Sequence, residues 1–410
     1  MPDFREVAVV TEEYFTHLLA DRPARAPIKA VFVCHRFVFW ACFAALIAEC
    51  ARRGSFESTV LIPHEAQPVE GGNTPDVAAL RHLGVRIEDI DSYDMSQHKV
   101  EIAFFQTPYV DARDDRFSPQ VLMLKGIRPV LIPYCTESLG GGEFLYAYFV
   151  KPPFYWRVFT ASVLSQSLYL CYQNMPEKNV PITGNPEYDM VVGQDYTQLA
   201  KYQRIKVAAK GRRIVLWAPH FSSGESLRWC TWDILGSEVI QCMRRLRKEV
   251  FVVFRPHHFL VHRFAGWQAG TKPTTSDELN MSYMHGAGNF YFDFDGLCIE
   301  SVLACDAVIA DCSSLLAKGM ALAKSVLYTA RAESDGVGYA QPFVDEHMHT
   351  TESVQGVQAF LEMLLKGEDP KVPAPQAARD FFCGAADGKA AVRIADLVEE
   401  HFRQGTGGAV

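Results

Sequence analysis

The feature that most constrains the fold is a repeated alternation of short apolar runs, rich in β-branched residues, with longer amphipathic stretches. In the first half of the chain this pattern predicts strands at residues 30–34, 58–62, 102–105 and 129–133. It predicts helices between them at residues 37–53, 74–83 and 119–125. Because a strand–helix–strand order joins parallel strands by crossovers, this half is predicted to be a parallel sheet covered by helices.

A second series of the same kind follows the turn at residues 183–186 and a charged helical stretch at 196–209. Here strands are predicted at 213–217, 250–254, 289–292, 307–310 and 325–328, and helices at 235–247, 297–305 and 314–323. We therefore expect an N-terminal Rossmann-like domain over residues 1–190 and a C-terminal one over residues 191–385. Residues 386–410 are expected to add a helix at 389–402 and a frayed end.

Composition limits the class of protein. Of the 410 residues, 49% are hydrophobic and 21% are charged, which suits a soluble globular chain with a sizeable core. The 40 Lys and Arg against 48 Asp and Glu give a net charge of −8, which argues against a protein whose main task is to neutralise a nucleic-acid backbone. The 11 cysteines include no C-x-x-C pair, so they indicate reduced, cytosolic thiols and neither a zinc framework nor a disulfide scaffold.

The sequence predicts no membrane-spanning segment. Residues 1–20 lack the basic and apolar regions of a secretory signal, and the longest apolar run, residues 37–48, is shorter than the roughly 20 residues that a spanning helix needs. The aromatic and basic stretch 145–163 could lie against a membrane surface or a lipid-linked acceptor, although an ordinary inter-domain helix is the simpler interpretation. We expect a cytoplasmic protein whose membrane contact, if any, is peripheral and at the cytoplasmic face.

Two Rossmann-like halves joined by a linker, without a G-x-G-x-x-G motif after the first strand, are typical of the GT-B arrangement of nucleotide-sugar glycosyltransferases. The predicted fold class is therefore α/β of GT-B type, with two Rossmann-like domains facing a central cleft that holds the active site. Periplasmic binding proteins and some ligases also pair α/β domains, so the pattern alone leaves those classes open.

Polar residues follow three predicted strands of the second half. Arg255 and His257 follow residues 250–254, and His220 and Ser222 follow residues 213–217. A guanidinium can make a forked contact to phosphate, and an imidazole can donate a hydrogen bond or transfer a proton. Because parallel strand ends converge on one edge of a sheet, these side chains are expected to lie together. Taken singly, each has an ordinary explanation: a surface ion pair for the arginine, and a loop histidine for each imidazole.

The third such segment follows the strand at 307–310. Asp311 ends that strand, and Ser313 and Ser314 stand at the start of a helix, where backbone amides and hydroxyls suit a diphosphate. Helix capping alone would explain the same residues.

In the first half, His35, Gln106 and Tyr134 follow the predicted strands, and Thr136 and Glu137 come shortly after. These residues offer a proton acceptor and hydrogen bonds to a substrate. The glycine run 140–142 is as consistent with a flexible linker as with a phosphate loop. His347 and His349 lie in a polar stretch and are interpreted as solvated, so we predict no metal site.

Four motifs in order resemble one family. They read WAPHFSSG (217–224), FRPHH (254–258) and ADCSSLLAKGMALAKSVLY (310–328), preceded by TGNPEYD (183–189). This order resembles the CDP-glycerol glycerophosphotransferase family, the teichoic-acid and TagF-like capsule polymerases. Upstream, FFQTPY (104–109) and VLIPY (130–134) extend the resemblance over roughly residues 28–330.

The resemblance implies a GT-B fold and transfer of a polyol phosphate from a CDP-activated donor to a cell-surface polymer or lipid-linked acceptor. It implies that the donor's phosphates are held by residues of the second half: Arg255, His257, Asp311, Ser313 and Ser314. His220 and Ser222 are expected in the same donor site, and Tyr134, Thr136 and Gln106 on the acceptor side. The mechanism expected is direct in-line attack, which needs no protein nucleophile, cofactor or metal.

The sequence departs from the family at the His-Gly-Thr motif that supplies the proposed base, because the corresponding residues 134–137 read Tyr-Cys-Thr-Glu. Glu137, His35 and His220 are therefore candidate bases, and His257 is a further catalytic candidate. Cys312 stands where tyrosine is common, and His258 where proline is common.

Two alternatives stay open. One is a GT-B glycosyltransferase, or an epimerase-like protein, that uses a nucleotide sugar. The other is a non-catalytic homologue that binds nucleotide or glycan. The sequence does not distinguish glycerol from ribitol or a sugar in the donor.

Overall fold

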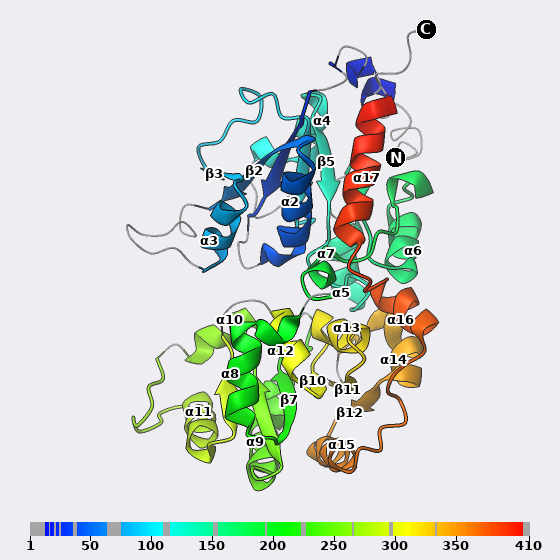
Figure 1. Cartoon of the computed structure of the whole chain (residues 1–410). Coiled ribbons are helices and arrows are strands. Elements are labelled where there is room, and N and C mark those ends of the chain that lie inside the picture. The colour runs from blue at the N-terminus through cyan, green and yellow to red at the C-terminus, as the bar shows by residue number, and fades with distance from the viewer. Residues whose placement is uncertain are drawn as a thin grey trace. The chain divides into compact units, whose positions relative to one another are not determined.

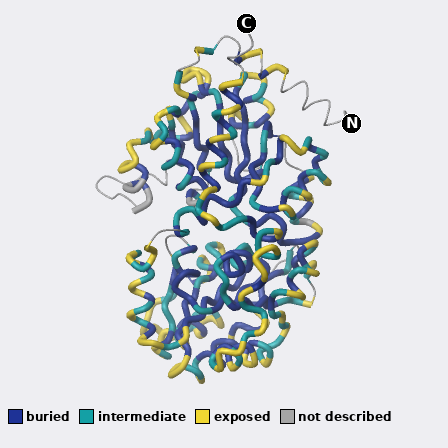
Figure 2. The backbone as a smooth tube through the Cα atoms, turned by 45° about the vertical axis from the view of Figure 1, so that its right-hand side comes forward, coloured by how far each residue is buried: buried dark blue, intermediate teal, exposed yellow. Residues whose placement is uncertain are grey.

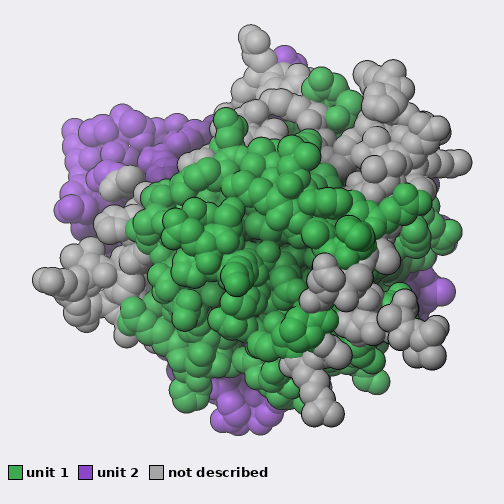
Figure 3. Space-filling view, turned by 90° about the horizontal axis from the view of Figure 1, so that it is seen from above, with its two compact units in different colours: residues 1–135, 145–193, 384–410 green, residues 136–144, 194–383 purple. Residues whose placement is uncertain are grey.

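A computed structural model of the chain describes residues 13–15, 17–19, 22–23, 26–35, 39–63, 75–109, 115–150, 155–192, 195–222, 227–264, 266–294, 298–332 and 334–404. The chain divides into two compact units, coloured in Figure 3. Unit 1 comprises residues 1–135, 145–193 and 384–410, and unit 2 comprises residues 136–144 and 194–383. Each unit contains a six-stranded parallel sheet with helices packed on it, so the prediction of two Rossmann-like domains is confirmed.

The sheet of unit 1 has the strand order β3-β2-β1-β4-β5-β6 (Figure 1). Its strands are β1 (Ile28–Val33), β2 (Phe56–Ile62), β3 (Arg86–Asp89), β4 (Ile102–Phe105), β5 (Arg128–Leu131) and β6 (Arg157–Val158). The helices of unit 1 include α2 (Ala41–Arg53), α3 (Pro75–His82), α4 (Pro119–Leu124), α6 (Val163–Tyr172) and α7 (Pro186–Asp189). β1 and β4 are almost continuously apolar because helices cover both faces of the sheet and bury them.

The sheet of unit 2 has the order β12-β11-β10-β7-β8-β9. Its strands are β7 (Arg213–Ala218), β8 (Val250–Phe254), β9 (Phe290–Phe292), β10 (Ala307–Ala310), β11 (Ser325–Thr329) and β12 (His349–Thr351). The helices are α8 (Ala200–Ala209), α9 (Trp232–Arg245), α10 (His258–Val261), α11 (Ser276–Ala287), α12 (Cys298–Ala304), α13 (Ser314–Ala321), α14 (Gln341–His347), α15 (Val354–Lys366) and α16 (Gln376–Cys383).

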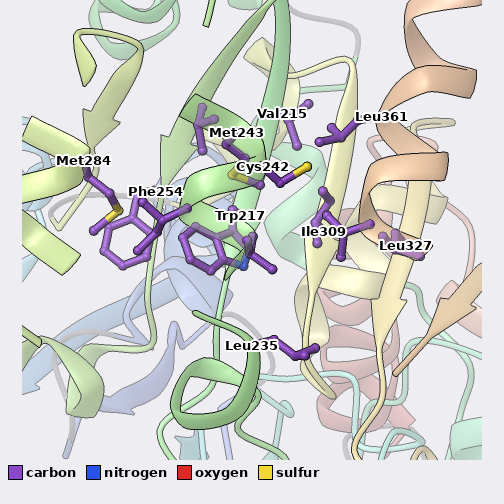
Figure 4. Close-up of a cluster of buried hydrophobic side chains, with 14 of the residues drawn as sticks. Val215, Trp217, Leu235, Cys242, Met243, Phe254, Met284, Ile309, Leu327 and Leu361 are labelled. Carbon is purple, nitrogen blue, oxygen red and sulfur yellow. The ribbon is translucent and has the colours of Figure 1, made fainter. Parts of the chain in front are cut away.

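The core of unit 2 lies between its sheet and the apolar faces of α9, α11 and α15 (Figure 4). Trp217, Phe254 and Ile309 come from neighbouring strands, while Met243 and Leu361 come from helices, and all are buried. Figure 2 shows the same pattern along the chain: buried residues lie in the interior of each unit, and exposed residues lie toward its outside. Burial of these large side chains supplies the main driving force for folding each unit.

Three strands were missed by the sequence prediction, and all three are short edge strands: β3, β6 and β12. An edge strand needs no continuous apolar run, and the pattern of β3, Arg-Ile-Glu-Asp, leaves most of its residues partly or fully exposed. The predicted helix over residues 37–53 begins later, at Ala41, and residues 36–38 lie outside the described ones.

The C-terminal helix is part of unit 1, whereas the sequence suggested a separate appendage from residue 386. Helix α17 (Ala390–Gln404) packs on α2 through an apolar stripe that includes Ile394 and Val398. The guanidinium of Arg53 on α2 also donates to the carboxylates of Asp396 and Glu399, at 2.7 and 3.0 Å. The end expected to be frayed was residues 404–410: Gln404 is the last residue of α17, and residues 405–410 lie outside the described residues.

Residues 136–144 belong to unit 2, although the sequence placed them in the first domain. Gly140 and Gly338 both have positive φ, and a Cβ on Gly338 would lie 2.0 Å from the carbonyl oxygen of Gly140. A Cβ on Gly140 would collide with the Phe144 ring at 2.7 Å. The glycine run is therefore a close-packed contact within unit 2, and the flexible-linker interpretation is wrong.

The stretch 145–163 is not one helix. It contains the end of α5 (Gly142–Leu145), a π-helical turn at Tyr146–Val150 and β6, while residues 151–154 lie outside the described ones. Across the described part of the chain, the structure contains no helix of the length and apolar character that crossing a membrane requires.

Candidate anion-binding site

Polar residues follow four neighbouring strands of unit 2, at the carboxyl edge of the sheet (Figure 1). Backbone hydrogen bonds hold these strand ends in register. The amide of Arg255 donates to the Trp217 carbonyl at 2.9 Å, and that of His257 donates to the Pro219 carbonyl at 3.0 Å. The amide of Asp293 donates to the Phe254 carbonyl at 3.0 Å. The structure thus places the three motifs of the second half at one sheet edge.

Asp311 is completely buried and accepts four hydrogen bonds from protein groups. One oxygen accepts from the amides of His220 (2.7 Å) and Thr231 (3.0 Å), and the other from the hydroxyls of Thr231 (2.5 Å) and Thr329 (2.7 Å). Burial raises the pKa of Asp311 to about 6, although these hydrogen bonds favour the charged form. Because both oxygens face protein donors, Asp311 positions the loop after β7 instead of presenting its carboxylate to a ligand.

The tautomer of His220 follows from its neighbours. Its Nδ1 lies 2.7 Å from the Ser222 hydroxyl and accepts from the Ser222 amide at 3.3 Å, while the amide of Trp229 donates to that hydroxyl at 3.2 Å. A backbone amide can only donate, so Nδ1 carries no proton and the neutral ring has its proton on Nε2. Burial, assisted by the charge of His258, lowers the pKa of His220 to about 3. His220 is therefore a neutral N–H donor at physiological pH, which argues against its expected role as a base.

His257 is arranged in the same way. Its Nδ1 accepts from the amide of Phe259 at 3.2 Å and so caps the first turn of α10. The proton of the neutral ring again resides on Nε2. The ring centroids of His220 and His257 are 4.8 Å apart, and Phe221 lies 4.5 Å from each of them. Two imidazoles of matching tautomer therefore stand side by side at this sheet edge.

Arg255 is held by a buried carboxylate. Its Nη1 donates to Asp293 Oδ2 at 2.7 Å, and Lys201 from α8 donates to the other oxygen at 2.9 Å. The hydroxyl of Ser301 also donates to Asp293. Burial alone would raise the pKa of Asp293, but the charges of Arg255 and Lys201 outweigh it and hold the pKa below its usual value. The Arg255 side chain remains 17% exposed, so it is a positioned cation that a ligand can reach.

Ser313 occupies the N-cap position of α13, yet its hydroxyl makes no capping hydrogen bond. Its Oγ is buried and has no hydrogen-bond partner among the described residues. Ser314 begins the helix, whose first amides have no intrahelical partner. Capping therefore does not account for Ser313, and the hydroxyl together with the helix end suits an anion.

The candidates from the first half are divided between the two units. His35, Gln106 and Tyr134 follow strands of unit 1, whereas Thr136 and Glu137 belong to unit 2 and are buried there. Gln106 is 2% exposed, and neither its amide oxygen nor its amide nitrogen has a hydrogen-bond partner in the described part of the chain. The structure brings the residues expected to hold the donor to one sheet edge of unit 2, whereas the residues expected on the acceptor side belong partly to unit 1 and partly to unit 2.

Sequence reasoning missed Lys201, Asp293, Thr231 and Trp229. Asp293 had a readable signal, because it directly follows a predicted strand, as Asp311 does. No sequence signal identified Lys201, because it lies 92 residues from the carboxylate that it contacts. Among the described residues, no group of three or more His, Cys, Asp or Glu side chains is arranged to hold a metal ion, and His349 pairs with Asp369 at 2.9 Å.

No protein-family model matches the chain, and no curated protein matches it in sequence. Solved structures do match. The wall teichoic acid polymerase TagF is 12% identical, with a TM-score of 0.62, over 98% of this chain and 96% of that one. UDP-GlcNAc 2-epimerase from Neisseria meningitidis, bound to UDP-GlcNAc, is 12% identical, with a TM-score of 0.57, over 91% of this chain and 100% of that one. At this identity the likeness establishes the fold, which is of GT-B type with two Rossmann-like domains.

Proposed function

We propose that this protein transfers a polyol phosphate from a CDP-activated donor to a hydroxyl of a cell-surface polymer or lipid-linked acceptor. The observation that carries the proposal is the group of anion-binding elements at the carboxyl edge of the second sheet. It combines Arg255, the Nε2–H groups of His220 and His257, and the uncapped start of α13 at Ser313. A diphosphate is the ligand class that such fixed, positive or N–H donors suit.

The chemistry assigned to this site is an in-line displacement. The acceptor oxygen attacks the β-phosphorus of the donor and forms the new P–O bond, while the bond from that phosphorus to the bridging oxygen breaks and releases CMP. The acceptor proton passes to a base. Charge grows on the bridging oxygen, so fixed donors at Arg255 and His257 would stabilise the transition state without a protein nucleophile.

Two sequence candidates change role in this proposal. Asp311 becomes a positioning residue because its oxygens are used by four protein donors. His220 becomes a donor to phosphate, since its Nδ1 accepts from an amide and its pKa is lowered to about 3. Glu137 and His35 remain the candidates for the base, with Tyr134, Thr136 and Gln106 proposed on the acceptor side.

The choice of a CDP donor is supported by the motif resemblance and by the TagF likeness, which includes a CDPG-soaked TagF structure (12% identity, TM-score 0.61). A second candidate function, chemistry on a nucleotide sugar, is supported by the likeness to the epimerase with bound UDP-GlcNAc. The nucleobase therefore distinguishes the two candidates.

We also propose that the protein acts in the cytoplasm, with peripheral contact at the membrane face where a lipid-linked acceptor would lie. Support comes from the stretch 145–163, in which the apolar side chains of Tyr146, Val150 and Val163 are 59%, 49% and 44% exposed. Exposed aromatic and aliphatic side chains near basic residues suit an interfacial contact.

The test is a calorimetric titration of the full chain with CMP, CDP, CDP-glycerol, UDP and a UDP-sugar, followed by an assay for CMP release. Arg255→Ala is compared with Arg263→Ala, a control arginine of the same unit that is also paired with aspartates, Asp233 and Asp277. The proposal predicts binding of cytidine nucleotides, with a loss of about tenfold or more, or roughly 1.4 kcal/mol, in Arg255→Ala only. Binding of uridine nucleotides supports the nucleotide-sugar candidate, and cytidine binding without turnover supports a non-catalytic homologue.

A further inference from the structure

The opposite, amino edge of the second sheet carries a basic pocket. It has a volume of about 700 Å³ and lies where β7, β8 and β10 begin, whereas the anion-binding site follows the ends of the same strands. Its charged lining residues are Lys206, Lys210, Arg212, Arg213, Lys248, Glu249 and Asp306. Five cations thus face two carboxylates in a chain whose net charge is −8.

The sheet register brings two separate basic runs together. Residues 206–213 end α8 and enter β7, and residues 244–248 end α9 and precede β8. Arg213 is the register partner of Val250, and its amide donates to the Glu249 carbonyl at 2.9 Å. In Figure 1, α8 and α9 lie beside β7 in the same unit. The positive charges are therefore brought together by the folding of the unit, because β7 pairs with β8.

Some of these charges have structural roles. Arg212 donates to the carbonyls of Ala208 and Ala209 at 2.9 and 2.8 Å, which satisfies the end of α8. Asp306 accepts the amide of Ile214 at 2.8 Å, so one of the two carboxylates is engaged with the backbone. These contacts do not use the remaining four cations.

Lys206, Lys210, Arg213 and Lys248 form no ion pair with a carboxylate in the described part of the chain. The last three are exposed to solvent, and Lys206 lies 5.4 Å from the Tyr202 ring centroid. The positive side chains around the pocket repel one another, and a bound anion would offset this unfavourable electrostatic energy. The pocket therefore has the electrostatic character of an anion site.

The lining of the basic pocket indicates what kind of anion it fits. Arg247 adds an exposed cation next to the pocket, because Arg212 of the lining donates to the Arg247 carbonyl at 3.1 Å. The pocket's apolar lining is limited to Ala209 and Ile214, and Ile214 is buried. A positive surface with several separate cations and without a cluster of exposed apolar side chains suits a chain of phosphates better than the interior of a bilayer.

We propose that this surface, defined by Lys206, Lys210, Arg213 and Lys248, binds an extended polyanion with repeated phosphate groups. The identification of that polyanion with a polyol-phosphate polymer rests on the proposed function, while the binding itself does not. A polymer held there would stay tethered to the enzyme between successive transfers at the other edge of the sheet.

The experiment measures binding of long-chain inorganic polyphosphate to the full protein at several salt concentrations. We expect Lys210→Glu/Lys248→Glu to weaken binding at least about tenfold and to reduce the salt dependence. The matched control Lys178→Glu/Lys272→Glu changes the charge equally at exposed lysines outside the pocket and should leave binding unchanged. Circular dichroism and thermal unfolding check that the variants remain folded, and Lys210→Gln/Lys248→Gln replaces any variant that does not fold.

The outcomes separate the two proposals. If Arg255→Ala abolishes polyphosphate binding while Lys210→Glu/Lys248→Glu retains it, the polyanion binds at the donor site and this inference is overturned. It is also overturned if phosphatidylglycerol vesicles bind through the basic surface while polyphosphate does not. If polyphosphate binds through this surface but cytidine nucleotides do not bind at all, the inference stands and the proposed function fails.

Discussion

The backbone amide of His220 donates a hydrogen bond to the carboxylate of Asp311 at 2.7 Å, across 91 residues of sequence. This bond joins the loop after β7 to the end of β10. It places the imidazole beside His257 while the carboxylate itself stays buried. An aspartate that resembles a ligand-binding residue in sequence thus fixes the loop that carries His220.

Replacing Asp311 with alanine tests this positioning role. The amides of His220 and Thr231 can only donate, so both lose their acceptor when the carboxylate is removed. We expect Asp311→Ala to lower the free energy of unfolding by about 1–3 kcal/mol or more, because buried donors are left unsatisfied. Denaturant unfolding measures this loss, and a variant as stable as the parent would contradict the role.

The variant Asp311→Asn is the matched comparison for this prediction. Its side-chain oxygen can still accept from the two amides, and its nitrogen can face the hydroxyls of Thr231 and Thr329, which are able to accept as well as donate. We therefore expect Asp311→Asn to keep more of the stability and of the nucleotide affinity than Asp311→Ala. A loss of affinity as large in Asp311→Asn as in Asp311→Ala would mean that the carboxylate charge acts on the ligand directly.

If His220 acts as a hydrogen-bond donor, glutamine at this position should preserve the nucleotide affinity and alanine should not. In His220→Gln the side-chain amide can place an N–H near the position of Nε2, whereas His220→Ala removes the donor. We expect nucleotide affinity to fall about tenfold or more in His220→Ala and to be largely kept in His220→Gln. The pH profile of turnover should keep its acidic limb in His220→Gln, since the pKa of His220 is already about 3. Loss of that limb would restore His220 as the base.

The contact of Gly338 with Gly140 predicts a steric effect that can be separated from backbone strain. Gly338→Ala places a Cβ 2.0 Å from the Gly140 carbonyl oxygen, while Gly288→Ala adds a Cβ at similar positive φ with nothing within 4 Å. The control should cost about 1 kcal/mol of stability, and Gly338→Ala several times more. Thermal unfolding compares them, and equal losses would mean that residues 136–144 are not tightly packed in unit 2.

The buried side chain of His401 makes the free energy of unfolding of unit 1 depend on pH. His401 Nε2 accepts from Arg128 Nε at 2.9 Å, and burial, with the charges of Arg128 and Arg157, lowers its pKa to about 3. Between pH 3 and 6.5 the unfolded chain therefore binds a proton that the folded chain does not, so stability falls as the pH is lowered. From pH 6.5 to about pH 5 the loss is about 1–2 kcal/mol for this residue.

The variant His401→Gln removes the titration while keeping an acceptor for Arg128. We expect its free energy of unfolding to change less than that of the parent over the same pH interval. His349→Gln is the matched control, since His349 is paired with Asp369 and lies in unit 2. An identical pH dependence in the parent and in His401→Gln would contradict the explanation.

Much of the fold could be predicted because the central strands of both sheets are buried on two faces and must be apolar throughout. The edge strands escaped prediction, since Arg86–Asp89 pairs on one side only and can carry charged residues. Segment 136–144 and helix α17 were assigned to the wrong part of the chain because long-range packing decides both. No local sequence pattern predicts the contact of Gly140 with Gly338 or that of α17 with α2.

In the candidate site, too, some features could be predicted from the local sequence and others depend on long-range contacts. Arg255, His257 and Ser313 could be found because they follow strands, and parallel strand ends meet at one edge. The protonation of His220 could not, because it depends on Ser222 and on the Trp229 amide that fixes the serine hydroxyl. The partner of Lys201 was equally hidden, since α8 reaches Asp293 only in the folded unit.

The most direct test of the central claim is a crystal structure of the full protein soaked with CDP. We predict the diphosphate at the carboxyl edge of the second sheet, within hydrogen-bond distance of Arg255, of the Nε2 atoms of His220 and His257, and of the Ser313 hydroxyl. A diphosphate bound elsewhere, or a site in which His220 turns Nδ1 toward the phosphate, would contradict this claim.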